Sequence, residues 1–447
     1  MSQEKLKIGD EPVFDARKLG TSKMIILGLQ HVFAMFGSTV LVPALTGLSV
    51  STTLLFAGIG TLLFHFLSKG KVPAFLGSSF AFLAGYWALA PNGEKELLPY
   101  ACFGVACAGL LYLVIAALFK LFGSSKVMRY FPPIVTGPII IAIGLNLSKS
   151  AIENCTASWG VALVAIVVVI ICNIWGKGMV KIIPILMGVV ASYIVGAIFG
   201  QVDFTPVAEA AWIGSPLAWD RTVFALWGSA DTHLLITSII TIVPIAIATI
   251  VEHIGDISAI SSTVGENYIK DPGLHRTLCG DGLATTIASL FGAPANTTYG
   301  ENTGVLTLTR VYDPRVIRLA AVFAIVFSFC PKLSALISAM PVATLGGVSL
   351  VLYGMISAVG VRNVVENKVD FTKSRNVIIA ALILVLSIGI NYSTNGAIII
   401  PVGEATISLS GLAVGSLVGI LLNAVLPGKD YVFTEGEPND THVNFEV

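Results

Sequence analysis

The sequence predicts an all-α polytopic membrane protein with fourteen transmembrane segments, arranged as two inverted repeats of seven segments each. Three observations lead to this fold class: the composition, the placement of basic residues and a weak internal repeat. Of the 447 residues, 55% are hydrophobic and only 12% are charged, whereas soluble domains carry about 25% charged residues. The formal net charge is zero, so the charge balance does not indicate nucleic acid as a partner.

Apolar segments follow one another along almost the whole chain. A spanning helix needs roughly 20 apolar residues, and the third, fifth and tenth segments are shorter than this or interrupted. Polar stretches at 1–23 and 427–447 are expected to form cytoplasmic tails. The fourteen expected segments are 24–43, 52–68, 73–90, 99–122, 132–147, 158–176, 181–200, 233–256, 273–293, 295–311, 316–336, 340–360, 374–391 and 408–426.

The placement of Lys and Arg supports this count. Cytoplasmic loops of membrane proteins collect basic residues. With the N-terminus inside, the loops expected outside hold only four of the 26 basic residues, namely Lys95, Lys149, Arg221 and Lys332. Omitting one segment would scramble the alternation, so an even number of segments with both termini in the cytoplasm is favoured.

Three pairs of similar stretches recur in the same order, seven segments apart. An odd number of segments per half inverts the second half in the membrane, and such inverted repeats are typical of secondary transporters. Chance similarity between apolar segments is the alternative. The pairs are "GLQHVFAMFG" (28–37) with "TIVEHIGDIS" (249–258), "VPAFLGSSFAF" (72–82) with "APANTTYGENT" (293–303), and "FPPIVTG" (131–137) with "MPVATLG" (340–346).

The second pair contains polar, glycine-containing backbone within apolar surroundings. In "NTTYGENTG" (296–304), two threonines and Tyr299 favour extended backbone, while Gly300 and Gly304 loosen a helix. Irregular backbone at membrane depth must face protein or a cavity. We therefore expect two short extended segments, each leading into a half-helix whose free N–H groups point toward a shared site. A kinked packing helix with glycines at a close crossing is the alternative.

Three acidic residues occur where the chain is otherwise apolar. Glu252 and Asp256 are four residues apart, so they share one helix face, and Glu301 lies in the interrupted tenth segment. Acids within a membrane indicate function by default, and two neighbouring carboxylates resist ionising together, which would retain a proton. The alternatives are an interfacial cap for Glu252 and Asp256, and a helix N-terminal acid for Glu301.

Other polar residues carry weaker signals. His31 and His253 occupy equivalent repeat positions, and each is more readily explained as a hydrogen-bonded orienting residue than as a proton relay. Asp281 is interpreted as a structural residue or a gate contact. The six cysteines form no CxxC pair, so a metal site or disulfide frame is not expected. No GxxxxGK, HExxH or GxSxG motif occurs, which argues against ATP as energy source and against an intramembrane enzyme.

These motifs resemble those of the nucleobase–ascorbate transporter family. "ENTGVLTLTR" (301–310) resembles the family signature of an acid or Gln, Asn-x-Gly, four residues, Thr and a basic residue. "LQHVFAMFG" (29–37) resembles the Gln-His motif of the first helix. "GSSFAF" (77–82), "EHIGD" (252–256) and "NTTYGEN" (296–302) resemble the substrate-binding stretches. The likeness covers nearly the whole chain.

The resemblance implies a division into two domains. A core domain would comprise 24–122 and 233–336, a gate domain 132–200 and 340–426, and an extracellular loop 201–232, with short antiparallel strands opening segments 3 and 10. A homodimer through the gate domain is also implied. The implied substrate contacts are Glu252, Glu301, Tyr299 and the backbone N–H groups of Phe80 and Gly300, supported by Gln30, His31, Ser79, His253 and Asn302.

The resemblance further implies import of uracil by proton symport across the plasma membrane, with Asp256 or Glu252 as the proton-coupling residue and the proton as the only coupling ion. One departure leaves the substrate open. Some uracil permeases of the family carry His at the position of Asp256, whereas xanthine and urate members carry Asp there with Gln at the position of Glu301. Xanthine or another purine base is therefore the second hypothesis. An anion exchanger or channel on the same architecture is a third.

Overall fold

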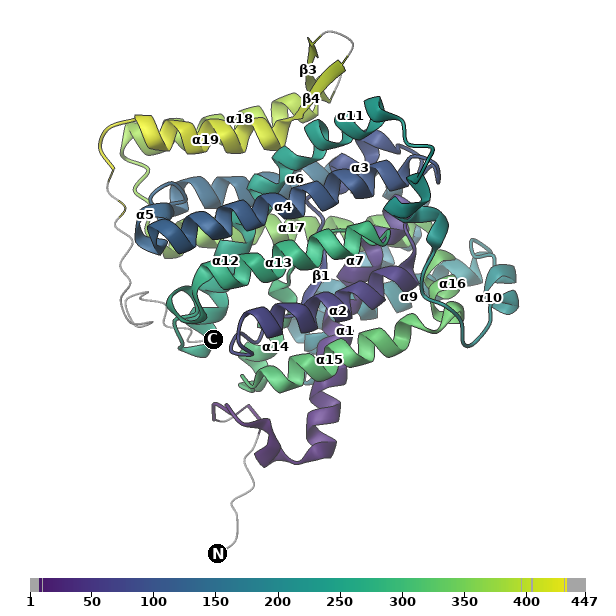
Figure 1. The fold of residues 1–447 in the computed structure, drawn as a ribbon. Helices are drawn as coiled ribbons and strands as arrows, with labels where there is room; N and C mark the ends of the chain where they lie inside the picture. The colour runs from purple at the N-terminus through teal and green to yellow at the C-terminus, as the bar shows by residue number, and fades with distance from the viewer. Residues whose placement is uncertain (1–7, 10, 395, 403–404, 430, 432–447) are drawn as a thin grey trace, which may run out of the picture.

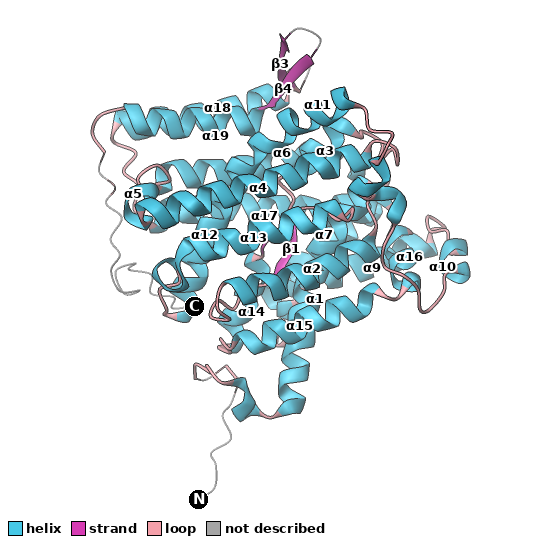
Figure 2. Cartoon of the chain, in the orientation of Figure 1, coloured by secondary structure: helices cyan, strands magenta, loops and turns pink. Residues whose placement is uncertain are grey.

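The computed structural model describes residues 8–9, 11–394, 396–402, 405–429 and 431. The first seven residues of the predicted N-terminal tail and most of the predicted C-terminal tail lie outside these residues. The side chain of Glu301 also lies outside the described part, although its backbone is in a helix. Figures 1 and 2 show a protein built almost entirely of helices.

The long apolar helices confirm a multi-pass membrane protein. Among the described residues, seven helices are long and apolar enough to cross a bilayer, or eight if one bent pair is counted. The seven are α1 (Thr21–Thr46), α2 (Val50–Leu67), α4 (Leu98–Phe122), α6 (Pro133–Thr156), the continuous pair α11 (Thr232–Ile242) and α12 (Ala246–Val264), α17 (Val342–Glu366) and α18 (Ser374–Asn391). The count of fourteen segments stays a prediction.

Shorter helices account for the rest of the apolar chain. Those within the bundle are α3 (Leu83–Leu89), α7 (Trp159–Trp175), α9 (Pro184–Ile198), α13 (Leu274–Leu290), α14 (Gly300–Thr309), α15 (Pro314–Ser328), α16 (Pro331–Ser338) and α19 (Gly411–Val425). The connecting helices are α5 (Ser124–Met128), α8 (Met179–Ile182) and α10 (Thr205–Glu209). In the bundle, α17 packs along α6, α15 packs on α2, and α13 contacts both α2 and α4.

The segment expected at 316–336 is not one helix. It consists of α15 and α16, which meet at an angle of 85°. The break falls at Cys330, whose backbone is not helical (φ −109°, ψ 89°), and α16 begins at Pro331. Proline cannot donate a backbone hydrogen bond inside a helix but fits the first helical position, so the chain turns where Pro331 starts the second helix.

Two short strands meet within the bundle although they are about 220 residues apart in sequence. Strand β1 (Leu76–Ser78) pairs antiparallel with β2 (Asn296–Thr298), with Gly77 opposite Thr297. Figure 2 shows β1 among the helices. The N–H of Ser79 donates to the carbonyl of Ala295 at 2.8 Å, and the N–H of Tyr299 donates to the carbonyl of Phe75 at 3.1 Å. Each strand leads into a short helix, α3 or α14.

A second pair of strands, a β-hairpin, was not expected from the sequence. Strands β3 (Ala397–Val402) and β4 (Ala405–Ser410) pair antiparallel between α18 and α19. The hairpin lies at the edge of the molecule above α11 (Figure 1), and β4 packs against α11. The side chains of 401–402 and 405–408 lie outside the described part of the structure.

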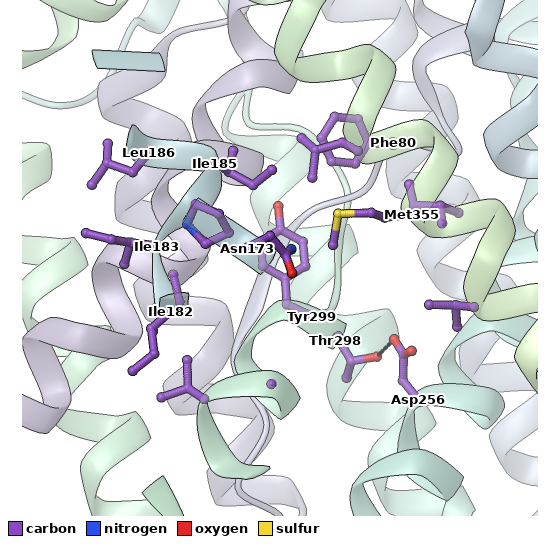
Figure 3. Close-up of a pocket in the computed structure, with 18 of the residues that line it drawn as sticks. Phe80, Asn173, Ile182, Ile183, Ile185, Leu186, Asp256, Thr298, Tyr299 and Met355 are labelled. Atoms are coloured by element: carbon purple, nitrogen blue, oxygen red, sulfur yellow. Dashed lines mark hydrogen bonds between the residues drawn. The ribbon is translucent and has the colours of Figure 1, made fainter. Parts of the chain in front are cut away.

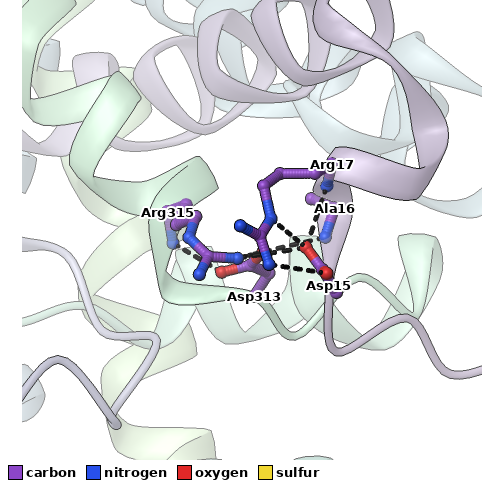
Figure 4. A network of polar contacts seen from close by, with 5 residues as sticks. All are labelled: Asp15, Ala16, Arg17, Asp313 and Arg315. Atoms are coloured by element: carbon purple, nitrogen blue, oxygen red, sulfur yellow. Dashed lines mark hydrogen bonds and ion pairs between the residues drawn. The ribbon is translucent and has the colours of Figure 1, made fainter.

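The described part of the N-terminal segment is docked on the start of α15. Val13 forms a parallel bridge with Val311, and the N–H of Ala16 donates to Asp313 Oδ2 at 2.8 Å. Arg315 Nη1 lies 3.0 Å from Asp15 Oδ1 and 3.3 Å from Asp313 Oδ2 (Figure 4). The hydrogen bond from the Arg17 side chain lowers the pKa of Asp15 to about 2, so this carboxylate keeps its charge to a lower pH than an unpaired Asp does.

Candidate functional site

A cavity of about 290 Å³ lies beside the β1–β2 pair. One wall comes from α12, β2 and the start of α14, together with Phe80 after β1. Apolar residues of α6, α9 and α17, here called the apolar wall, form much of the remaining lining; Figure 3 shows Ile185 of α9 on one side of Tyr299 and Met355 of α17 on the other. Small-molecule sites have volumes of about 300–1,000 Å³, so this cavity is just below that range and fits only a small ligand.

The structure brings together most of the residues predicted to contact substrate. Phe80, Glu252, Tyr299 and Gly300 all line this one cavity, together with Asp256, which was predicted as a proton-coupling residue. They come from three separate stretches of sequence, which the strand pairing and the packing of α12 on β2 and α14 bring side by side. For Glu301 only the backbone is described, in the first turn of α14 next to Gly300.

Asp256 is held by a residue that the sequence analysis did not single out. The Thr298 hydroxyl donates to Asp256 Oδ2 at 2.7 Å, and both residues line the cavity (Figure 3). Thr298 is the last residue of β2. The hydrogen bond therefore fixes the carboxylate of α12 against the strand that leads into α14.

Tyr299 connects the two strands and α1. Its hydroxyl donates to the carbonyl of Ser78 at 2.9 Å and lies 3.3 Å from Thr39 Oγ1. The ring lies over Gly77, because a Cβ added there would be 2.4 Å from Tyr299 Cε2. Tyr299 is 5% exposed, so its ring forms a fixed aromatic part of the cavity wall.

The start of α14 supplies backbone donors. The first N–H groups of a helix have no partner within that helix, and they carry the positive end of the helix dipole. Tyr299 is the N-cap residue in extended conformation and provides no side-chain cap. Since Gly300 lines the cavity and has open space around its Cα, a carbonyl oxygen of a ligand can approach these N–H groups closely.

The apolar wall was missed by sequence reasoning. Ile140 of α6, Ile185 of α9 and Met355 of α17 line the cavity. In the sequence they belong to uniformly apolar segments. In such segments the residue type does not distinguish a position that lines a cavity from one that faces lipid. Two polar residues, Asn173 and Lys181, also line the cavity.

Five predicted supporting residues lie behind the cavity and do not line it. Asn302 Nδ2 lies 3.1 Å from His31 Nδ1 and 3.3 Å from the His31 carbonyl, which joins α14 to α1. The backbone of Ser79 pairs with β2, as described above. Gln30 is 7% exposed and lines a second cavity next to α8.

His253 points away from the cavity toward α13. Its Nδ1 lies 2.7 Å from Asp281 Oδ2, and both side chains are completely buried. Asp281 of α13 is thus a polar partner of His253 on α12. The sequence could not have paired these residues, because they belong to different segments.

The arrangement favours a neutral, flat, polar ligand. Carboxylate oxygens of Glu252 and Asp256 accept hydrogen bonds, the N–H groups at the start of α14 donate them, and Tyr299 and Phe80 provide aromatic surface. An anion would meet the two acids of α12, and among the described residues that line the cavity the basic side chain is that of Lys181, on α8.

Solved structures of similar fold are membrane transporters. The transmembrane domain of a cyanobacterium bicarbonate transporter, BicA, matches with a TM-score of 0.56 and 16% identity, covering 92% of this chain and 99% of that one. The murine Slc26a9 anion transporter in the inward-facing state matches with a TM-score of 0.60 and 12% identity, covering 94% and 69%. At such identities the likeness concerns the fold.

Sequence relatives are much closer. The chain is 41% identical to a uracil permease of Bacillus caldolyticus, covering 94% of this chain and 96% of the relative. It is 39% identical to uracil permeases of Bacillus subtilis, with 96% and 97% covered, and of Escherichia coli, with 90% of each covered. The sequence profile described as "Permease family" matches residues 22–396. The chain therefore belongs to this permease family, the nucleobase–ascorbate transporters that its motifs resemble.

Proposed function

We propose that this protein imports uracil by proton symport across the bacterial plasma membrane. The observation that carries the proposal is the convergence of Glu252, Asp256, Tyr299 and the start of α14 on one small cavity. Uracil presents two ring N–H donors and two carbonyl acceptors on a flat ring. Glu252 and Glu301 would accept from the N–H groups, the backbone N–H groups of Phe80 and Gly300 would serve the carbonyls, and Tyr299 would flank the ring.

Transport would proceed by alternating access between the core domain, which carries the acids, and the gate domain, which carries the apolar wall. The cavity extends to Asn173 and Lys181, and the sequence places Lys181 at a cytoplasmic end. This supports an inward-facing arrangement with both termini in the cytoplasm. A homodimer through the gate domain belongs to the same proposal.

Proton coupling is assigned to the acid pair on α12. Glu252 and Asp256 are one helical turn apart and line one cavity, and uracil itself is neutral. Taking up one proton reduces the charge that must move through the low-dielectric barrier when the carrier reorients. The Thr298 hydroxyl bound to Asp256 would hold the carboxylate in place between the two states.

The test is uptake of labelled uracil into cells or proteoliposomes, with unlabelled xanthine, hypoxanthine and thymine as competitors. Saturable, uncoupler-sensitive uptake that only pyrimidines inhibit is expected. Stronger inhibition by xanthine would favour the purine alternative, which the combination of Asp256 with Glu301 keeps open. Uptake of bicarbonate or sulfate without uracil uptake would favour the anion exchanger, for which the fold of the solved neighbours is the only support.

The coupling role is tested by Asp256→Asn. This variant mimics the protonated acid, so uracil binding and exchange between equilibrated pools should persist while uptake driven by a pH gradient fails. Asp313→Asn, which makes the same acid-to-amide change outside the cavity, serves as the comparison. Continued accumulation of uracil by Asp256→Asn in response to a proton gradient would transfer the coupling role to Glu252 or Glu301.

A further inference from the structure

We propose that Thr61 and Thr285 are positioning residues, whose hydroxyl groups cap the free edges of the β1–β2 pair and thereby hold the backbone of the substrate site in place. The inference rests on the proposed function of the cavity as a substrate site. Neither residue lines the cavity, and neither is among the site residues predicted from the sequence.

A two-stranded sheet has two free edges, and here both lie among membrane-spanning helices. The hydrogen bonds that flank the strands join Ser79 to Ala295 and Tyr299 to Phe75. Backbone groups of alternate residues point in opposite directions, so those of Leu76 and Asn296 point outward from the pair. Within a bilayer such groups must find partners inside the protein.

Thr61 of α2 provides hydrogen-bond partners for the outward-pointing backbone groups of β1. Its hydroxyl accepts from the N–H of Leu76 at 2.9 Å and lies 3.3 Å from the Leu76 carbonyl, to which it donates. One hydroxyl thus serves both backbone groups of the same residue. Thr61 and Leu76 are both fully buried, so water cannot replace the hydroxyl.

Thr285 of α13 provides a hydrogen-bond donor for the outward-pointing carbonyl of β2. Its hydroxyl donates to the carbonyl of Asn296 at 2.8 Å, and Thr285 is fully buried. The side chain of Asn296 donates in turn to the carbonyl of Phe56 on α2 at 3.0 Å. Gly60 leaves room for this amide, because an added Cβ would lie 2.2 Å from Asn296 Nδ2.

The two halves of the chain thus share the same hydrogen-bonding arrangement. In each half, the helix that precedes the strand contributes a threonine near its C-terminal end, and that threonine binds the outer edge of the strand. Each strand has only three residues, so few other bonds hold its position. β1 leads to Phe80 and β2 leads to Tyr299 and Gly300, so a displaced strand displaces the donors and the aromatic ring of the site.

The experiment compares Thr61→Val and Thr285→Val with Thr61→Ser and Thr285→Ser in the purified full-length protein. Valine keeps the shape and removes the hydroxyl, whereas serine keeps the hydroxyl. The matched control is Thr53→Val on the same helix, since the Thr53 hydroxyl donates to the carbonyl of Ser49, the N-cap residue of α2, at 2.7 Å and not to a strand. Uracil affinity and hydrogen exchange of peptides covering 72–80 and 293–300 are measured.

We expect each valine variant to bind uracil about tenfold more weakly, as the loss of a buried hydrogen-bond partner implies, and the serine and control variants to bind within about twofold of wild type. Exchange should increase in 72–80 for Thr61→Val and in 293–300 for Thr285→Val, without a change in the transmembrane helices remote from the strands. A positioning role also requires the exchange rate of transport at saturating uracil to stay close to wild type.

Wild-type affinity and unchanged strand exchange in a folded valine variant would overturn the proposal. Equal losses in the serine variants would overturn it too, because side-chain shape and not the hydroxyl would then matter. If only the serine variants fold, the hydroxyls serve the fold itself and the positioning role is rejected. If wild type binds no uracil, the proposed function fails, and the exchange measurements still decide whether the hydroxyls hold the strands.

Discussion

Replacing Gly77 by alanine is expected to displace the Tyr299 ring and thereby weaken uracil binding. Gly77 is in β1 opposite Thr297, and an added Cβ would lie 2.4 Å from Tyr299 Cε2, 2.5 Å from Cζ and 2.6 Å from Thr39 Oγ1. The methyl group cannot be accommodated unless the Tyr299 ring moves. The ring would then lose its 2.9 Å hydrogen bond to the Ser78 carbonyl and enter the cavity that it lines.

The size of the effect follows from two terms. Inserting a methyl group into a packed interior costs about 1–3 kcal/mol, and the Tyr299 hydrogen bond contributes about 0.5–1.5 kcal/mol to stability. If the displaced ring must return before uracil binds, the steric term alone weakens binding by about fivefold to 150-fold. Binding is measured by calorimetry in detergent, together with the melting temperature.

Gly389→Ala on α18 is the matched control, because an added Cβ there meets no atom within 4 Å. The double variant Gly77→Ala/Tyr299→Leu removes the clash, so it should recover much of the lost stability without recovering uracil affinity. The reasoning is refuted if Gly77→Ala binds uracil like wild type and melts at the same temperature, since the Tyr299 ring could not then lie against β1.

Three further predictions concern other contacts of the structure. Thr298→Val removes the 2.7 Å hydrogen bond to Asp256 and should lower proton-driven uracil accumulation roughly threefold to tenfold, while Thr298→Ser keeps it; equal accumulation by both would contradict the assignment. Asp313→Asn weakens the acceptor of the N-terminal segment and should raise protease sensitivity before α1 without abolishing uracil exchange; unchanged cleavage would show that the segment is held otherwise. A cysteine at Lys95 should react with an impermeant reagent in intact cells and one at Lys126 only after permeabilisation, whereas the reverse pattern would overturn the topology.

The sequence allowed prediction of those site features that depend on residue type and repeat position. Glu252 and Asp256 stand out because acids are rare in apolar segments, and "NTTYGENTG" stands out because its residues suit a helix poorly. The structure indeed places these residues around one cavity. Their roles in binding and coupling remain predictions, and the Glu301 side chain is outside the described residues.

The remaining features depend on contacts between distant segments, which one sequence does not reveal. Thr61 and Thr285 look like ordinary small residues of apolar helices, and only the strand register shows that their hydroxyls meet Leu76 and Asn296. Ile185 and Met355 belong to apolar segments in which lipid-facing and cavity-facing positions have the same composition. The bend before Pro331 could have been expected from proline's missing N–H, but the surrounding residues are apolar enough for one continuous helix.

The distribution of polar groups between the two walls has a consequence for transport. Hydrogen bonds are directional and need close geometry, whereas apolar burial is non-directional. The acids, the α14 N–H groups and Tyr299 belong to α12 and the β2–α14 segment, whereas α6, α9 and α17 contribute apolar side chains, among them Ile140, Ile185 and Met355. A base bound by hydrogen bonds would therefore remain with the α12–β2–α14 wall when the walls move relative to each other, and it would lose only apolar contacts that another part of α17 or α9 can replace. Under the proposed function, the α12–β2–α14 segment would therefore carry the base, and the apolar residues of α6, α9 and α17 would form the surface along which it moves.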